Sequence, residues 1–260
     1  MGPIVPPLVP PYETVGQGPH HVMAVHGWFS DRAAYAAMLP HIDRRAFTYV
    51  LPDLRGYGEA RDLPGAYTTA EAGQDLLALA DELGWERFSL LGHSMGGAVV
   101  QRVVAAAPHR VRRLVGVAPV PASGVPMEGE QWQLFANAAD RPENRRTIID
   151  LTTGGRHPAV WLDLMVRHSV EHSDAKAFRA WLDSWALEDF HEEIDGARVP
   201  VRVVVGAHDP ALTAEVMRQT WLRWYPNAEL VELPCAGHYP ADETPLELVR
   251  AVEDFIATDA

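Results

Sequence analysis

Short, strongly apolar runs alternate with longer segments of helical periodicity along most of the 260-residue chain. Most of these runs are apolar at nearly every position, whereas a strand with one solvated face would alternate apolar and polar residues. Strands buried on both faces need helices on both sides of their sheet, which is the arrangement of a mostly parallel α/β fold. The runs are VMAV at 22–25, TYVL at 48–51, FSLL at 88–91, LVGVA at 114–118, VRVVV at 201–205 and ELVEL at 229–233.

Two segments, 68–83 and 244–256, carry clear helix signals. Each begins with Thr-x-x-Glu, the pattern of a capping box, and the second also has a proline in its first turn. Their apolar residues recur at helical spacing, so we expect both helices to cover the sheet. The predicted buried positions are Leu76, Leu79, Ala80 and Leu83 in the first helix and Leu246, Val249, Val252 and Ile256 in the second.

The alternation stops between residues 121 and 195, where only helical patterns occur. An all-helical block inserted in an α/β chain indicates a cap. We therefore predict a core domain from 1–120 and 196–260 and a cap from 121–195. A small helical layer needs large side chains to bury enough area, which accounts for the aromatic residues of this block. Alternatively, some of them line a substrate pocket, and the candidates are Trp132, Trp161, Trp181 and Trp185.

Charge and cysteine content exclude several classes of protein. The chain has 22 Lys and Arg against 35 Asp and Glu, a formal charge of −13, and no basic cluster that could neutralise a phosphate backbone, so we expect no nucleic-acid partner. A single cysteine, Cys235, excludes an internal disulfide and fits a reducing compartment. The proline-rich segment Met1–Tyr12 lacks the positive region of a signal peptide, and we interpret it as an extended arm. We expect a cytoplasmic protein without a membrane partner.

The stretch SLLGHSMGGAVV at 89–100 places a serine between an apolar strand and a helix. Its G-x-S-x-G pattern is short enough to occur by chance, and Ser94 could simply be a small residue in a turn. Gly92 and Gly96, however, let the strand and helix backbones approach closely around a sharp turn that exposes the serine at the carboxyl end of the sheet. We therefore predict that Ser94 is a nucleophile.

A serine nucleophile needs a base and an acid. Of the twelve histidines, His238 follows the last predicted strand at the carboxyl edge of the sheet. Asp209 comes just past the strand VRVVV, and no acid occurs at the alternative strand end, 117–124. The order Ser94, Asp209, His238 is that of the α/β-hydrolase arrangement. If Asp209 is not the acid, Glu193 and Asp195 are the alternatives.

Two backbone N–H groups are predicted to stabilise an oxyanion. Met95 follows the nucleophile at a helix N-terminus. Trp28 follows His26-Gly27 in the loop after the first predicted strand, where the second donor is expected, and His26 is predicted to brace that loop. The side chains of Trp28 and Phe29 belong either to the core or to the pocket wall.

Five motifs follow one another from about Val22 to the C-terminus: HGWF at 26–29, PDLRGYG at 52–58, GHSMGG at 92–97, GAHD at 206–209 and AGHYP at 236–240. Together they resemble the α/β-hydrolase superfamily, in particular its small capped carboxylesterases and lactonases. The resemblance implies a cofactor-free Ser–His–Asp hydrolase that cleaves a small, largely apolar ester or lactone. Relatives often continue the second motif with serine, whereas Glu59-Ala60 follow here. Phe29, Tyr57 and Met127 are further candidates for the pocket wall.

Other activities share this organisation. Dehalogenases and epoxide hydrolases of the fold carry aspartate at the nucleophile position, so serine at 94 argues against both. A carbon–carbon hydrolase of the aromatic ring-cleavage type uses the same three residues and stays open, as does perhydrolase side activity. A small-molecule receptor could also keep the triad, and sustained turnover would distinguish an enzyme from it.

The segment His168-Ser-Val-Glu-His172 matches H-x-x-E-H, in which two histidines four residues apart can face one metal ion. No third ligand is evident in the sequence, and a solvated helical face accounts for these residues equally well. We therefore assign no metal and no cofactor.

Overall fold

A computed structural model describes residues 6–258. These residues form a seven-stranded sheet in the order β1-β3-β2-β4-β5-β6-β7. β1 pairs antiparallel with β3, and all the remaining neighbouring pairs are parallel. The prediction of a mostly parallel α/β sheet is confirmed. The strands are β1 (Tyr12–Gly16), β2 (His20–Val25), β3 (Phe47–Pro52), β4 (Phe88–His93), β5 (Val111–Val117), β6 (Val201–Gly206) and β7 (Ala228–Leu233).

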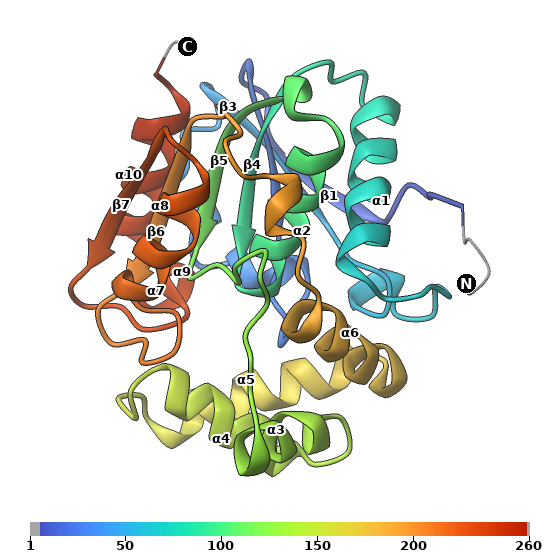
Figure 1. Cartoon of the computed structure of the whole chain (residues 1–260), viewed down its shortest axis with the longest axis vertical. Helices are drawn as coiled ribbons and strands as arrows, with labels where there is room; N and C mark the ends of the chain where they lie inside the picture. The colour runs from blue at the N-terminus through green and yellow to red at the C-terminus, as the bar shows by residue number, and fades with distance from the viewer. Residues whose placement is uncertain (1–5, 259–260) are drawn as a thin grey trace.

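Helices cover both faces of the sheet (Figure 1). α1 (Thr69–Glu82) and α2 (Met95–Ala106) pack on one face, and α10 (Pro245–Ile256) packs on the other. Successive residues of β2 face opposite cores: Val22 and Ala24 belong to the α10 side, and Met23 and Val25 to the α1–α2 side. This two-sided burial explains why the strands are apolar at consecutive positions. The remaining α-helices of the sheet layers are α7 (Ala214–Gln219), α8 (Trp221–Trp224) and α9 (Pro240–Glu243).

The edge strand β1 was not predicted. It begins at Tyr12, where the extended arm was expected to end, and pairs with β3 from Tyr12 opposite Pro52 to Gly16 opposite Thr48. Three of its five side chains are exposed, so it lacks the apolar run that marks the other strands. Residues 1–5 of the expected arm lie outside the described residues.

The capping-box predictions hold only in part. The Thr68 hydroxyl accepts the N–H of Glu71 at 3.1 Å, but the Glu71 carboxylate accepts from Ala66 and Tyr67 instead of Thr68. At α10 the second box is wrong, because Thr244 makes no side-chain cap bond and its N–H donates to Pro240 of the preceding helix α9.

The buried stripe of α10 is shifted from the prediction. Leu246 is 64% exposed, whereas Leu248 and Phe255 are buried together with the predicted Val249, Val252 and Ile256. The chain enters α10 directly from α9, so the first turn faces solvent and the stripe starts later.

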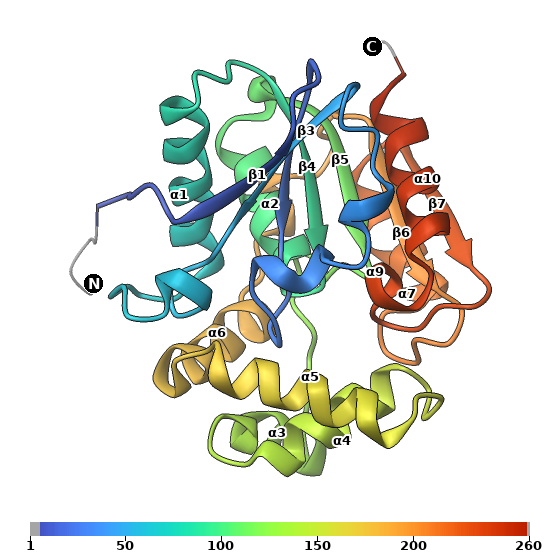
Figure 2. The ribbon, with the colours of Figure 1, turned by 180° about the vertical axis from the view of Figure 1, so that it is seen from behind.

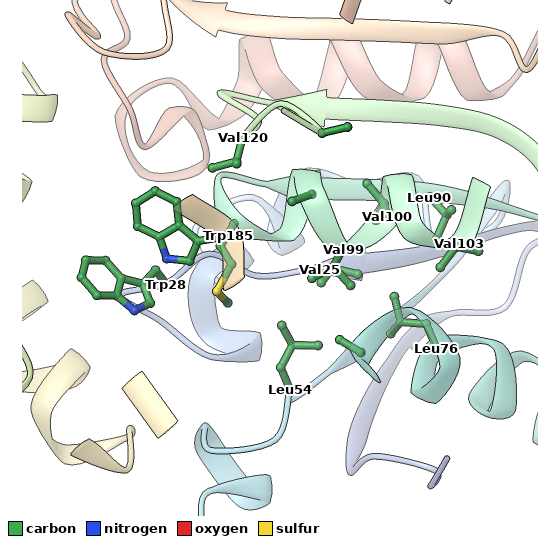
Figure 3. Close-up of a cluster of buried hydrophobic side chains, with 14 of the residues drawn as sticks. Val25, Trp28, Leu54, Leu76, Leu90, Val99, Val100, Val103, Val120 and Trp185 are labelled. Carbon is green, nitrogen blue, oxygen red and sulfur yellow. The ribbon is translucent and has the colours of Figure 1, made fainter. Parts of the chain in front are cut away.

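Four helices form a separate layer beyond the carboxyl ends of the strands, as Figures 1 and 2 show. They are α3 (Gly129–Ala136), α4 (Pro142–Thr152), α5 (Ala159–Glu171) and α6 (Ala175–Leu187). The indole N–H of Trp181 in α6 donates to the carbonyl of Arg55 at 2.9 Å, which joins this layer to the sheet layers. Figure 3 shows Trp185 of α6 beside Trp28 at the edge of the core cluster, with ring centroids 5.4 Å apart. That residues 121–195 form a distinct cap domain stays a prediction.

None of the helices within residues 6–258 has both the length and the apolar character needed to cross a membrane.

Candidate active site

Ser94 occupies a strained turn between β4 and α2. Its backbone has φ +54° and ψ −120°, a positive φ that residues with a Cβ rarely adopt. A Cβ on Gly92 would lie 2.5 Å from the carbonyl oxygen of Gly96, and one on Gly96 would lie 2.5 Å from that of Val25. The turn therefore requires both glycines, and it presents the Ser94 side chain at the carboxyl end of the sheet.

The three predicted triad residues meet at this point. His238, in the loop after β7, places its Nε2 2.9 Å from Ser94 Oγ. Its Nδ1 lies 2.7 Å from Oδ2 of Asp209, which follows β6. Both distances are those of hydrogen bonds, so the three side chains form a continuous chain from hydroxyl to carboxylate.

Asp209 is held as a carboxylate. Its side chain is buried, and burial alone would raise its pKa. The charge and hydrogen bond of His238 outweigh this effect, together with N–H groups of Ala211 at 2.9 Å and Leu212 at 3.2 Å that donate to Oδ1, so the pKa of Asp209 is lowered.

The alternative acids, Glu193 and Asp195, are both exposed, and the Glu193 carboxylate pairs with Arg102 at 3.2 Å. The structure therefore brings Asp209, and neither alternative, to His238.

His93, next to the serine, supports the histidine loop. Its Nε2 lies 2.7 Å from the carbonyl oxygen of His238. Burial lowers the pKa of His93 to about 3, so the ring is neutral and donates an N–H to that carbonyl.

The loop after β2 passes directly against the serine. A Cβ on Gly27 would lie 3.0 Å from His93 Nδ1 and 3.1 Å from Ser94 Cβ. His26 braces this loop as expected: its Nε2 accepts the N–H of Leu54 at 3.1 Å, which leaves Nδ1 to donate to the Gly27 carbonyl at 2.9 Å.

Met95 is the first residue of α2, where N–H groups have no helical partner. The N–H groups of Met95 and Trp28 stay the predicted oxyanion donors.

Two cavities meet at Ser94 and His238. Trp28, Phe29 and Tyr239 line both. They enclose about 670 Å³ and 540 Å³ of empty space, including the solvent at their mouths. The first cavity, between the β2 loop, α5 and α9, is also lined by Tyr35, Met165, His168 and Asp242. The second, toward α3, α4 and α6, is also lined by Val120, Met127, Phe135, Ile148, Trp185 and Leu212.

A family model described as the alpha/beta hydrolase fold matches residues 20–160, which run from β2 through Ser94 into α5. The chain belongs to the α/β-hydrolase fold family. The resemblance inferred from the five motifs is thus confirmed.

Similar proteins of this α/β-hydrolase family include esterases. A pimeloyl-(acyl-carrier protein) methyl ester esterase of Nitrosomonas europaea is 29% identical over 255 residues, 93% of this chain and 97% of the relative. The dihydrolipoyllysine-residue acetyltransferase component of the acetoin cleaving system of Pseudomonas putida is 30% identical over 239 residues, 87% of this chain and 60% of the relative. A solved hydrolase from Oleispira antarctica shares the fold, with a TM-score of 0.85 at 18% identity over 95% of this chain and 94% of that one. The relatives support ester hydrolysis in general.

Of the seven predicted pocket residues, three line a cavity that reaches the serine of this α/β-hydrolase chain. Phe29 lines both cavities, and Met127 and Trp185 line the second.

The other four do not line either of these two cavities. Tyr57 is buried between the rings of His26 and Trp181, with centroids 5.0 and 6.4 Å away, and the Trp181 indole is bonded to the main chain. Trp132 lines a shallow surface groove, and Trp161 packs on His157 with centroids 4.4 Å apart.

One buried acid near the site was not singled out from the sequence. Glu243, in α9, has a side chain that is 2% exposed. Its carboxylate accepts the N–H groups of Gly237 at 2.8 Å and Tyr239 at 3.0 Å, the two residues that flank His238. It also lies 3.3 Å from Arg156 and 3.0 Å from His157, in the loop between α4 and α5. Glu243 therefore holds the histidine loop and ties it to the helical layer.

Several cavity residues were not predicted. Val120 and Leu212 follow β5 and β6, so their place beyond a strand end is a signal that sequence reasoning could have used. Met165 and His168, in contrast, lie within α5, where nothing in the sequence marks the face turned toward the serine.

Proposed function

We propose that the chain is a serine hydrolase that cleaves a small, largely apolar carboxylic ester or lactone through an acyl-enzyme on Ser94. The observation that carries this proposal is the hydrogen-bonded chain from Ser94 through His238 to Asp209, with distances of 2.9 and 2.7 Å, at the meeting point of two cavities. The esterase relatives support the same reaction class.

In the proposed reaction, His238 Nε2 takes the hydroxyl proton as Ser94 Oγ attacks the ester carbonyl carbon. The N–H groups of Met95 and Trp28 stabilise the oxyanion that forms. As the tetrahedral intermediate collapses, the imidazolium returns the proton to the leaving alkoxide. Water then attacks the acyl-enzyme with His238 again as base, which releases the acid and restores the serine. Asp209 orients His238 and stabilises its charged form.

The second cavity is suited to an apolar acyl group. Met127, Phe135, Trp185 and Leu212 present hydrophobic surface there, and its polar lining includes Gln131. Three of these four apolar side chains come from residues 121–195, so the proposed cap would set the acyl specificity. The leaving alcohol would occupy the first cavity.

The decisive experiment is steady-state hydrolysis of chromogenic esters of graded acyl length by the wild type and Ser94→Ala in parallel. We expect sustained turnover by the wild type, a loss of several orders of magnitude in kcat in the variant, and a chain-length optimum set by the second cavity. A single burst without cycling, or ligand-induced stabilisation without reaction, would instead indicate a receptor or a carbon–carbon hydrolase with a narrow substrate range.

A further inference from the structure

Three potential metal ligands gather at the edge of the first cavity. His168 Nε2 lies 3.0 Å from Oδ1 of Asp31, and His172 Nδ1 lies 2.8 Å from Oδ2 of the same carboxylate. The three ligating atoms all lie within 4.8 Å of one another, and the two imidazole rings stack with centroids 4.2 Å apart. Asp31 belongs to the loop after β2, whereas the histidines lie in the last turn and at the C-cap of α5. Two distant parts of the chain therefore converge on one point.

The Asp31 carboxylate is unusual for a surface acid. Its side chain is only 6% exposed, and each of its oxygens faces a different imidazole. Its position is fixed because Oδ1 also accepts the N–H of Ala33 at 2.9 Å. The His172 carbonyl accepts the N–H of Gly58 at 2.9 Å, which fixes the end of α5 against the core. Both parts of the cluster are thus held in place by bonds outside it, as a preorganised ligand set requires.

We propose that Asp31, His168 and His172 bind a divalent transition-metal ion, with Zn²⁺ as the best-suited ion. Two imidazoles and one carboxylate are common zinc ligands, and Zn–ligand bonds of about 2.0–2.1 Å place neighbouring ligand atoms about 3.3 Å apart. The observed separations of 3.0 and 2.8 Å need only a small expansion to reach this value. Each neutral imidazole would carry its proton on the other ring nitrogen, so that the nitrogen facing Asp31 offers its lone pair.

The structure supplies the third ligand that the H-x-x-E-H segment lacked. Asp31 lies 137 positions before His168 in the sequence, so no local motif could identify it. Glu171, the acid of that segment, is exposed and is not a member of the cluster. The arrangement is therefore a two-histidine, one-carboxylate site between α5 and the β2 loop.

A bound ion would join α5 to the loop that carries the oxyanion donor Trp28, three residues before Asp31. His168 also lines the cavity that reaches Ser94, so the ion would lie at the edge of the substrate site without contacting the triad. Its predicted role is to fasten the helical layer to the core. Binding does not depend on the proposed ester hydrolysis and can be measured without any substrate.

The test is titration of tag-free protein, stripped with EDTA and dialysed, with Zn²⁺ by calorimetry and with Co²⁺ by visible absorption. We expect one equivalent to bind, with the d–d bands of a low-coordinate Co²⁺ site and a rise in Tm. His172→Gln, at the exposed end of the cluster, should weaken affinity by at least about tenfold, the low end of the loss seen when only an outer partner of a metal ligand is removed. His168→Gln should do the same.

The matched control is His191→Gln. His191 also contacts an aspartate, with its Nδ1 2.6 Å from Asp189, but it has no second imidazole in a ligand cluster. This variant should bind Zn²⁺ like the wild type. Absence of a binding event up to 100-fold excess metal, or binding that is unchanged in both cluster variants, would overturn the proposal. Circular dichroism of each variant shows whether a loss of binding reflects a loss of fold.

Discussion

Glu243→Gln is the substitution that most directly tests how the histidine loop is held. The carboxylate accepts Tyr239 N–H on Oε1, and Oε2 accepts Gly237 N–H while facing Arg156 and His157. A glutamine has one acceptor oxygen and one amide donor in the same space. If its oxygen takes the more crowded Oε2 position, its NH₂ group faces the N–H of Tyr239, and one buried donor loses its partner.

The expected loss of stability in Glu243→Gln follows from the one hydrogen bond that is lost. A buried N–H left without a partner costs about 1–3 kcal/mol, and the lost negative charge weakens the remaining contacts further. We therefore expect the free energy of unfolding to fall by about 2–3 kcal/mol. His238 lies between the two residues that Glu243 holds, and a displacement of about 1 Å in a catalytic group can lower the rate about 100-fold. We expect kcat to fall about 10- to 100-fold with KM little changed, because Glu243 does not line either cavity.

The assay combines thermal unfolding with ester hydrolysis under saturating and limiting substrate. Glu247→Gln is the control: it removes the same charge four residues further on, from an exposed position in the first turn of α10, and should change stability by less than about 0.5 kcal/mol. Glu243→Asp, which keeps the charge, should recover part of the lost kcat. If Glu243→Gln matched Glu247→Gln in both Tm and kcat, the idea that Glu243 positions His238 would be refuted.

Three other predictions follow from the site and the core. Asp209→Asn should lower kcat by roughly four orders of magnitude, because an amide favours the wrong tautomer of His238; near-normal activity would refute the acid assignment. Trp185→Ala, which enlarges the second cavity, should move the optimum in a series of p-nitrophenyl esters toward longer acyl chains, and an unchanged optimum would place the acyl group elsewhere. Glu253→Gln should raise stability at pH 8 by about 1–2 kcal/mol after allowance for solvent screening, and leave it unchanged at pH 4. Burial and nearby carboxylates raise the pKa of Glu253 from 4.5, its value in the unfolded chain, to about 7 in the folded protein. The wild type therefore loses stability as the pH rises from 4.5 to 7, because the folded state disfavours the charged carboxylate. Equal unfolding midpoints for the wild type and the variant at pH 8 would contradict this.

The site residues at the strand ends could be predicted because few positions in a sequence follow a recognisable strand. A strand buried on both faces is visible as an apolar run, and the residue that follows it lies at the carboxyl edge of the sheet. Ser94 and Asp209 each follow such a run. His238 follows the last predicted strand, β7, which is less buried but also ends at this edge of the sheet, so the convergence of the three residues could be inferred without knowing any contact. The short strand β1 lacked that run and was missed, and Leu246 was misplaced because the helix before it, α9, redirects the first turn of α10.

The helical layer was not predictable at the same level. Its tryptophans occur on several helices, and helical periodicity does not say which neighbour each face meets. Trp181 turned out to bond the main chain of Arg55, while Trp185 reached the cavity, although both lie on α6 within four residues. The pair of Asp31 and His168 depends on how α5 lies across the β2 loop, which is a property of the whole fold.

The position of the proposed oxyanion donor, Trp28, also depends on how the helical layer packs against the core. The indole of Trp28 stacks on Phe178 of α6 with centroids 4.1 Å apart, and its Nε1–H donates to the Phe178 carbonyl at 2.8 Å. The Trp28 side chain is therefore anchored by a residue 150 positions away, in the helical layer. Because Trp28 and Asp31 share one short loop, displacement of α5 or α6 would disturb the proposed oxyanion donor and the proposed metal ligands together. The helical layer would thus influence the proposed reaction through this loop as well as through the walls of the pocket.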